Sequence, residues 1–517
     1  MNKEPIHLLN LLKKSLGTIL LLAIIGELIF FPSLANFYGC LMAIISFGIF
    51  YQFLNEKYIR DSPFSFFMYL SMFMYRFLPL IATIIEGKPI TYGFERPYET
   101  FIYEILLFLI SSLAFYLACK NEKSTSKNNA FKQVLFELKF FEITPNILWG
   151  MGLLGFMIRI YNFNAGTAEY GDVSGKFISS LNYLMYAPLI LMFPSLLNLK
   201  YSKTKFVWLY TIVVFVISIA SNSRQSIITP IAIISLMFFL YVVTNNIKIT
   251  RLLAPWKIIF FATALFLILS ILSKISTAML FTRTIRSDVD KVELFQETIR
   301  VIQNEDLMAR LKDASNLKTS TLTSYQEGWT EHYVDNFMLE RYANMRITDE
   351  TLFYAEKKGY SNPQMLELFN KNVLSLFPTP LLSLFGIYLD KSEFKYSRGD
   401  FLYGSGFGGY RVTSHIGDGL ATFGYWYFLL QFFCFLIIFK LLNTFTYYKD
   451  KRINYAPFGL MNLFTFLGMF RNAQGIIGDV GYIVRGYIQG IVTYLIIYYI
   501  VRSIFRVLNF NKKYISN

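Results

Sequence analysis

The chain has 517 residues, of which 54% are hydrophobic and 18% aromatic, whereas only 16% are charged. A soluble globular protein typically has about 25% charged residues, so this composition excludes an ordinary soluble domain and favours a membrane protein. The three cysteines, Cys40, Cys119 and Cys434, lie in or beside apolar segments. The polar part of the chain therefore has no disulfide framework.

Apolar segments recur along the chain. A helix needs about 20 apolar residues to cross the hydrocarbon core of a membrane. We count twelve candidates, of which the fifth, seventh and eleventh are short: 16–34, 36–54, 63–84, 100–119, 146–161, 177–199, 206–221, 226–243, 258–280, 418–440, 456–471 and 481–503. The sequence thus predicts an all-α polytopic membrane protein with about 12 transmembrane helices.

The orientation follows from lysine and arginine, which concentrate in short cytoplasmic loops. With the N-terminus inside, the inside segments carry 24 of these residues and the short outside loops carry five. Both termini are therefore expected in the cytoplasm. The net charge of +15 gathers on the cytoplasmic rim, where it meets anionic lipid. It is not clustered in a polar domain, as nucleic-acid binding would require.

One long polar segment, 281–417, separates the ninth candidate helix from the tenth. It has 16 basic and 18 acidic residues and is expected outside the cell. Apolar residues at helical spacing predict a helix from about Val289 to Leu311, and further helices are expected around Tyr333–Arg346 and Asn362–Leu376. The predicted division is a membrane bundle of nine helices (1–280), a large, mainly helical extracytoplasmic loop (281–417) and a bundle of three helices (418–517).

An apolar run from Val373 to Leu389 lies inside this loop and contains Pro378 and Pro380. A thirteenth span would put one terminus outside, against the charge distribution. We therefore expect a re-entrant or surface-lying segment.

Several cations lie at or near the predicted outer ends of apolar helices. Charges in such positions are costly and face protein or water. Because arginine binds phosphate oxygens in a bidentate way, the set indicates an anion pocket at the outer leaflet. The alternative is that the side chains extend to the interface or pair with Glu104 and Glu27. The residues are Arg159, Arg224, Lys274, Arg471 and Arg485, with Arg76 deeper in the third helix.

The segment Arg398–Tyr427 combines six glycines between 399 and 417 with groups that can do chemistry. Arg398 and Arg411 can bind an anion. His415 and Asp418 are three residues apart at the start of the tenth helix, and either can take a proton from a hydroxyl. The alternatives are a surface-loop histidine at 415 and a helix N-cap at Asp418.

Evidence for a metal or cofactor is weak. Asp288 and Asp290 form an Asp-x-Asp pair, a pattern that can bind a divalent cation. The pair directly precedes a predicted helix, so acidic N-terminal residues are the preferred interpretation. The sequence has neither zinc-ligand spacing nor a phosphate-binding Walker loop. We therefore expect no metal and no cofactor.

Two segments resemble the O-antigen polymerase (Wzy) family of oligosaccharide repeat-unit polymerases. "SNSRQ", ending at Gln225, is similar to the family's small-Ser-Arg element. The distal loop is similar to the family's pattern of a proline-containing apolar stretch followed by Lys, Ser, Ile-Gly, an acid and Phe-Gly. These positions are Pro378, Lys391, Ser414, Ile416-Gly417, Asp418 and Phe423-Gly424. The chain departs from the family at Asn222, where Gly is frequent, and at Asp418, where Glu is frequent.

The resemblance implies a metal-independent glycosyltransferase that polymerises undecaprenyl-diphosphate-linked oligosaccharides at the outer face of a bacterial plasma (inner) membrane. The product would be O-antigen, capsule or a related surface polysaccharide, and a chain-length regulator protein is a possible partner. His415 is then the first candidate for the base and Asp418 the second. The diphosphate would be bound by arginines, namely Arg224, Arg398, Arg411, Arg159 and Arg471.

Three other functions remain open from the sequence. An O-antigen ligase would transfer a finished glycan, and His415 fits its pattern too. A lipid-linked oligosaccharide flippase would suit twelve helices, but flippases usually have two similar halves with short outer loops. A scaffold or sensor would not require outward-facing arginines near an acid and a histidine.

Overall fold

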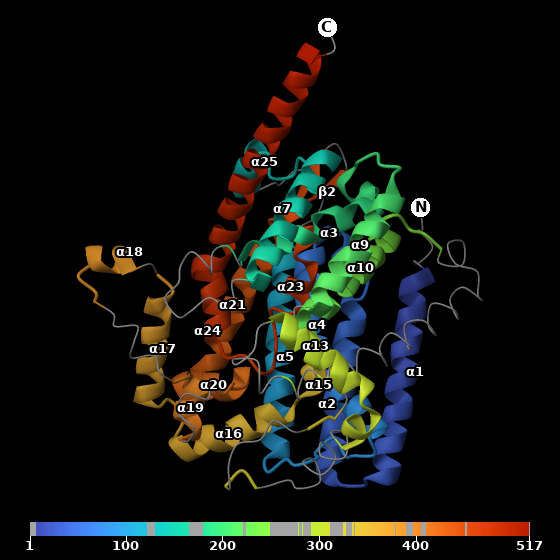
Figure 1. Cartoon of the computed structure of the whole chain (residues 1–517). Coiled ribbons are helices and arrows are strands. Elements are labelled where there is room, and N and C mark those ends of the chain that lie inside the picture. The colour runs from blue at the N-terminus through green and yellow to red at the C-terminus, as the bar shows by residue number, and fades with distance from the viewer. Residues whose placement is uncertain are drawn as a thin grey trace. The chain divides into compact units, whose positions relative to one another are not determined.

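The computed structural model confirms a helical, membrane-embedded protein (Figure 1). It describes residues 7–120, 130–164, 178, 180–220, 224–248, 278, 282, 291–310, 324–326, 333–335, 337–377, 379–388, 396–404, 410–449 and 452–515. Among these residues, seven helices are long and apolar enough to cross a membrane. They span His7–Phe30, Leu34–Phe53, Pro63–Ile85, Pro97–Lys120, Gln225–Thr244, Trp426–Asn443 and Ile477–Val507.

The chain packs into two compact units. Unit 1 comprises 1–122, 313–443 and 466–488, and unit 2 comprises 123–312, 444–465 and 489–517. Residues of the long polar segment, 281–417, therefore occur in both units. The three-part division expected from the sequence kept this segment as one part.

The membrane helices of unit 1 pack around α4, whose side chains are mostly buried. The core is aromatic: Phe50 stacks on Phe73 with ring centroids 4.0 Å apart, and Tyr69 stacks on Phe115 at 4.6 Å. Such rings supply large buried areas and specific geometry. The membrane helices are α1 (His7–Phe30), α2 (Leu34–Phe53), α4 (Pro63–Ile85), α5 (Pro97–Lys120) and α21 (Trp426–Asn443), and the six-residue α3 (Glu56–Asp61) lies between α2 and α4 in the chain.

Short helices complete unit 1. Asn362 caps the start of α17 with its side chain, as Asn does at helix N-termini. Serines cap α19 and α20 in the same way. The elements are α15 (Phe337–Ala343), α16 (Arg346–Lys358), α17 (Pro363–Ser375), α18 (Thr379–Leu384), α19 (Arg398–Tyr403), α20 (His415–Phe423), α23 (Leu463–Leu467, at the boundary with unit 2), α24 (Ile477–Gly481) and a π-helical turn (Tyr482–Gly486).

Unit 2 is held together by a close approach between α7 and the 3-10 helix η1. A Cβ atom added at Gly155 would lie 2.2 Å from the backbone nitrogen of Met185, so only glycine fits there. Small residues allow such backbone proximity between membrane helices. The elements are α6 (Ala130–Glu137), α7 (Pro145–Asn164), η1 (Leu181–Met192), η2 (Pro194–Leu197), α9 (Thr204–Ala220), α10 (Arg224–Thr244), α13 (Lys291–Gln303), β1 (Thr446–Lys449), β2 (Arg452–Tyr455), α22 (Pro457–Met461) and α25 (Tyr487–Ile515, which begins in unit 1).

The small β-hairpin was not expected from the sequence. Strands β1 and β2 are antiparallel, with Thr446 opposite Tyr455 and Lys449 opposite Arg452.

The predicted spans compare unevenly with the helices. The first four, the eighth and the twelfth correspond to α1, α2, α4, α5, α10 and the helical run from α24 into α25. The sixth contains 3-10 helix and includes Pro188, which lacks the N–H that an α-helix needs. The eleventh forms two five-residue helices, α22 and α23. The ninth, 258–280, lies almost entirely outside the described residues, so the count of twelve is not confirmed.

The tenth predicted span, 418–440, is broken. Helix α20 ends at Phe423 and α21 starts at Trp426. Gly424 between them has φ of 56°, a left-handed conformation that favours glycine. The break separates a short helix, α20, from the membrane-spanning α21.

Candidate active site

His415 is the first residue of α20 in unit 1. The side chain of Ser414 accepts a hydrogen bond from the backbone N–H of Gly417 at 3.0 Å and thereby caps this helix. His415 is only 3% exposed. The alternative of a surface-loop histidine is therefore wrong, and so is the alternative of Asp418 as the N-cap.

The imidazole is held from both sides. Its Nε2 lies 3.0 Å from Oδ2 of Asp479 on α24, and its Nδ1 lies 2.8 Å from the hydroxyl of Tyr427 on α21. Gln431 donates to the same oxygen of Asp479 at 2.6 Å. An ionised carboxylate only accepts, so Nε2 carries the shared hydrogen and Nδ1 accepts from Tyr427. A carboxylate in this position fixes the tautomer and orientation of a histidine base.

Phe470 covers the imidazole. Its ring centroid lies 5.4 Å from that of His415 with an interplanar angle of 25°. The same ring meets Tyr75 edge-on at 5.7 Å, and the guanidinium carbon of Arg76 lies 5.4 Å from its centroid. Phe470 thus connects the histidine to two side chains of α4.

Asp418, the second base candidate, is bound to Arg398. The Nε and Nη2 atoms of Arg398 lie 2.9 and 2.7 Å from Oδ1 of Asp418. Arg398 also donates to the carbonyl of Met365 at 3.0 Å and to the hydroxyl of Thr422. Both members of the ion pair are buried. This arrangement joins α19 to α20 and to α17, so it has a structural role whatever else it does.

A second buried ion pair lies in the bundle. Nη2 of Arg76 is 2.6 Å from Oε2 of Glu104, and Thr348 on α16 donates to the other oxygen of Glu104 at 2.9 Å. For Arg76, the alternative of pairing with Glu104 therefore holds in place of the anion pocket. Through Thr348, the pair also ties α16 to α5.

These groups form a buried charged cluster around Tyr427. Its members within unit 1 are three carboxylates and two guanidinium groups: Asp479, Asp418, Glu104, Arg76 and Arg398. The carboxylate of Asp479, which contacts the ring directly, can stabilise an imidazolium formed during a reaction.

Arg471, which directly follows Phe470, forms a cationic pair with Arg341 of α15. Burial and the nearby positive charge of Arg341 lower the pKa of Arg471. Among the described residues, neither arginine has a carboxylate partner at ion-pair distance. The hydroxyl of Tyr75, a residue that also acts electrostatically on Arg471, is buried without a hydrogen-bond partner among the described groups. Arg471, the exposed Arg341 and the unused hydroxyl of Tyr75 are therefore candidates for binding an anion.

The remaining predicted arginines lie elsewhere. Arg411 follows the glycine-rich stretch in unit 1, where its backbone N–H donates to Asp400 at 3.0 Å. Arg159 belongs to unit 2 and donates to the hydroxyl of Ser226 on α10 at 2.8 Å. Arg224 is the first residue of α10. Unit 1 therefore contains five of the seven predicted site residues, and unit 2 contains Arg159 and Arg224.

The sequence predicted His415 but missed the residues that hold it. Asp479 follows Gly478 and precedes an apolar run. An acidic residue at the start of a helix was the signal in the sequence that could have indicated it as a site residue. Tyr427 and Gln431 lie in an aromatic-rich helix and gave no distinct signal. Arg341 lay within a predicted loop helix.

No family model, curated protein or solved structure matches this chain. The functional argument therefore rests on the site itself. Among the described residues, no group of three or more His, Cys, Asp or Glu side chains is placed to hold a metal ion. His415 can accept a proton and is oriented by the carboxylate of Asp479, and the ring of Phe470 covers it. The next residue after Phe470 is Arg471, on which the charge of Arg341 acts.

Proposed function

We propose that the protein is a membrane glycosyltransferase that polymerises undecaprenyl-diphosphate-linked oligosaccharide repeat units. The observation that carries the proposal is the position of His415, whose imidazole lies between Asp479 and Tyr427 and is covered by the ring of Phe470. Arg471 follows Phe470 in the chain. The resemblance to O-antigen polymerases adds support, because the same histidine lies in the matching distal-loop segment.

The reaction needs two functions that this arrangement can supply. An acceptor hydroxyl must lose a proton, and general-base catalysis by a positioned histidine contributes roughly 10²–10⁴-fold. A diphosphate must leave with its negative charge stabilised, for which Arg471 and Arg341 are the candidates in unit 1. Arg224 and Arg159 belong to unit 2, and their role in binding the diphosphate stays a prediction from the sequence.

The proposed step is a balanced displacement. The acceptor oxygen forms a bond to the anomeric carbon of the donor sugar, and the bond from that carbon to the diphosphate oxygen breaks. The acceptor's hydroxyl proton passes to the hydroxyl oxygen of Tyr427, and the proton of Tyr427 passes to Nδ1 of His415. Undecaprenyl diphosphate leaves with the bonding electron pair. The product is a longer oligosaccharide on the acceptor lipid.

Access to the base requires motion, because His415 and Tyr427 are buried. Phe470 stacks on the imidazole, so its displacement would open the path between the dyad and Arg471. Opening and closing of this kind is common in enzymes that exclude water. The proposed location is a bacterial plasma membrane, with both termini in the cytoplasm and the site facing outward.

Complementation of a deletion strain tests the proposal. Wild-type protein is expected to restore a ladder of long surface glycans, whereas His415→Gln restores only single repeat units. His7→Gln is the matched control, because His7 is exposed on α1. Full chain length with His415→Gln, at wild-type protein levels, would contradict the role of the dyad.

The same strains distinguish the alternatives. Loss of a ligase would leave polymer on undecaprenyl diphosphate instead of on its final acceptor. Loss of a flippase would trap single units on the cytoplasmic leaflet. The proposal requires single units on the outer leaflet.

A further inference from the structure

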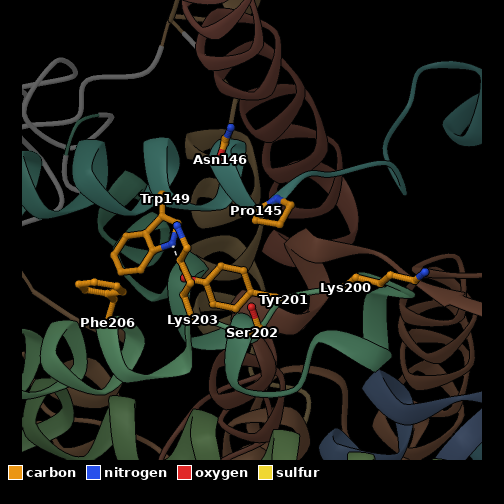
Figure 2. Close-up of a pocket in the computed structure, with 8 residues that line it drawn as sticks. All are labelled: Pro145, Asn146, Trp149, Lys200, Tyr201, Ser202, Lys203 and Phe206. Carbon is orange, nitrogen blue, oxygen red and sulfur yellow. Dashed lines mark hydrogen bonds between the residues drawn. The ribbon is translucent and has the colours of Figure 1, made fainter.

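A pocket of about 560 Å³ lies in unit 2, at the starts of α7 and α9. This volume is within the range of small-molecule sites, roughly 300–1,000 Å³. Figure 2 shows its lining, with Trp149 and Phe206 on one side and Lys200 extended on the other. The eight residues are Pro145, Asn146, Trp149, Lys200, Tyr201, Ser202, Lys203 and Phe206.

The lining combines cations with aromatic rings. Lys200 and Lys203 supply ammonium groups. The indole N–H of Trp149 donates to the hydroxyl of Tyr201 at 3.2 Å, which joins α7 to the segment before α9. Tryptophan, tyrosine and lysine in combination are typical of the boundary between lipid headgroups and hydrocarbon.

The surface next to the pocket is apolar and open. On α9, the exposed fractions of Phe206, Trp208 and Leu209 are 49%, 57% and 61%. Leu153, one turn beyond Trp149 on α7, is also 49% exposed. A ligand with a charged head in the pocket would therefore find apolar helix surface for an attached chain.

We propose that this pocket binds the phosphate of an anionic phospholipid headgroup. Both ammonium groups pair with the phosphate once the side chain of Lys200 turns inward from the extended position that it has in Figure 2. The acyl chains lie along the exposed apolar residues of α9. The starts of α7 and α9 add the positive ends of two helix dipoles. Anionic lipid is abundant in the cytoplasmic leaflet, and the charge distribution along the chain predicts that this end of both helices lies there. The site uses none of the residues of the proposed glycosyltransferase centre and does not depend on that function.

The test uses the full chain, purified in detergent and titrated with phosphatidylglycerol or phosphatidylcholine, with bound lipid counted by native mass spectrometry. The wild type is expected to bind phosphatidylglycerol more tightly. Lys200→Gln/Lys203→Gln is expected to weaken that binding about tenfold to thirtyfold, because each lysine near anionic lipid contributes of the order of 1 kcal/mol. Lys248→Gln/Lys440→Gln removes the same charge from the same predicted membrane face and is expected to retain wild-type affinity.

Three results would overturn the proposal. Equal binding of both lipids would show that the headgroup charge does not matter. Equal weakening by the two double substitutions would indicate only diffuse electrostatic attraction. Displacement of phosphatidylglycerol by millimolar inorganic phosphate would indicate a site for a free anion. Selective loss with Lys200→Gln/Lys203→Gln, without competition by phosphate, supports the headgroup assignment.

Discussion

Nε2 of His415 lies 3.0 Å from a carboxylate oxygen of Asp479, although the two residues are 64 positions apart in the chain. His415 starts a short helix, α20, whereas Asp479 lies in α24, which is followed directly by a π-helical turn. Such turns inside helices frequently mark functional sites. Because Asp479 accepts the hydrogen of Nε2, it fixes the orientation of the buried imidazole.

Replacing Asp479 tests whether this orientation matters. Asp479→Asn preserves size but allows the amide to favour the wrong tautomer of His415. We expect kcat to fall by roughly 10²–10⁴-fold, the range typical of a positioned proton acceptor. The measurement is the rate of glycan extension by purified protein. Asp335→Asn, at an exposed position, is the control, and equal rates for the two variants would contradict the assignment.

The Arg398–Asp418 ion pair is expected to act mainly on stability. Asp418→Asn leaves a buried guanidinium without its counter-charge, and breaking such a pair costs about 3–5 kcal/mol. We expect a large fall in the thermal unfolding temperature in detergent. Arg398→Met/Asp418→Leu removes both charges and should recover much of the loss.

The same variants decide between structure and chemistry at this position. If Arg398→Met/Asp418→Leu is stable but inactive, the roles predicted from the sequence, diphosphate binding and proton transfer, gain support. Retained activity would assign the pair to the fold alone.

The cationic pair is expected to bind the diphosphate. Arg471→Gln and Arg341→Gln should each raise the KM for lipid-linked substrate about tenfold, because charge-assisted hydrogen bonds contribute of the order of 1.5–3 kcal/mol. Their effects should be less than additive, since both act on one anion. Arg300→Gln, exposed on α13, is the control. Unchanged KM in both single variants would remove the pair from the site.

Asp349 on α16 is expected to make stability depend on pH. Burial raises the pKa of this carboxyl to about 7, although the backbone N–H groups of Arg96 and Glu95 donate to it. The other charges acting on it are Glu95, which raises the pKa, and Arg346, which lowers it. Between the unfolded pKa near 4 and the folded pKa near 7, only the folded protein holds this proton. Its contribution to stability is therefore lost as the pH rises through 7.

Thermal unfolding at pH 5.5 and 8.5 tests this linkage. Asp349→Asn retains an oxygen acceptor but cannot ionise, so the wild type should lose stability relative to this variant at the higher pH. A difference between the two proteins that is constant with pH would contradict the prediction.

Apolar length and composition predicted the helices that are simplest in physical terms. The predicted 63–84 and the observed Pro63–Ile85 nearly coincide, because a long apolar run in a membrane must satisfy its backbone internally. Prediction failed where the backbone departs from a regular helix. Gly424 breaks the tenth span, and Pro188 lies within a 3-10 helix. The mean hydropathy of a run of about 20 residues changes little with a single glycine or proline, so it does not reveal such a break.

The site was predictable only in part for a similar reason. His415 was identified from a local pattern, but its partner Asp479 is distant in sequence and is brought near by folding. Arg398 and Asp418 were assigned separate roles, whereas folding pairs them across 20 positions. Spacing reveals neighbours along one helix. It does not reveal partners on different helices.

The most direct test of the central claim is extension by the purified full-length protein alone. Lipid-linked repeat units are extracted from the deletion strain and incubated with the protein in liposomes, and the products are analysed by mass spectrometry. The account predicts a ladder of longer lipid-linked glycans, one undecaprenyl diphosphate released per bond formed, and neither product with His415→Gln. Release without a ladder, or a ladder that persists in His415→Gln, would contradict it.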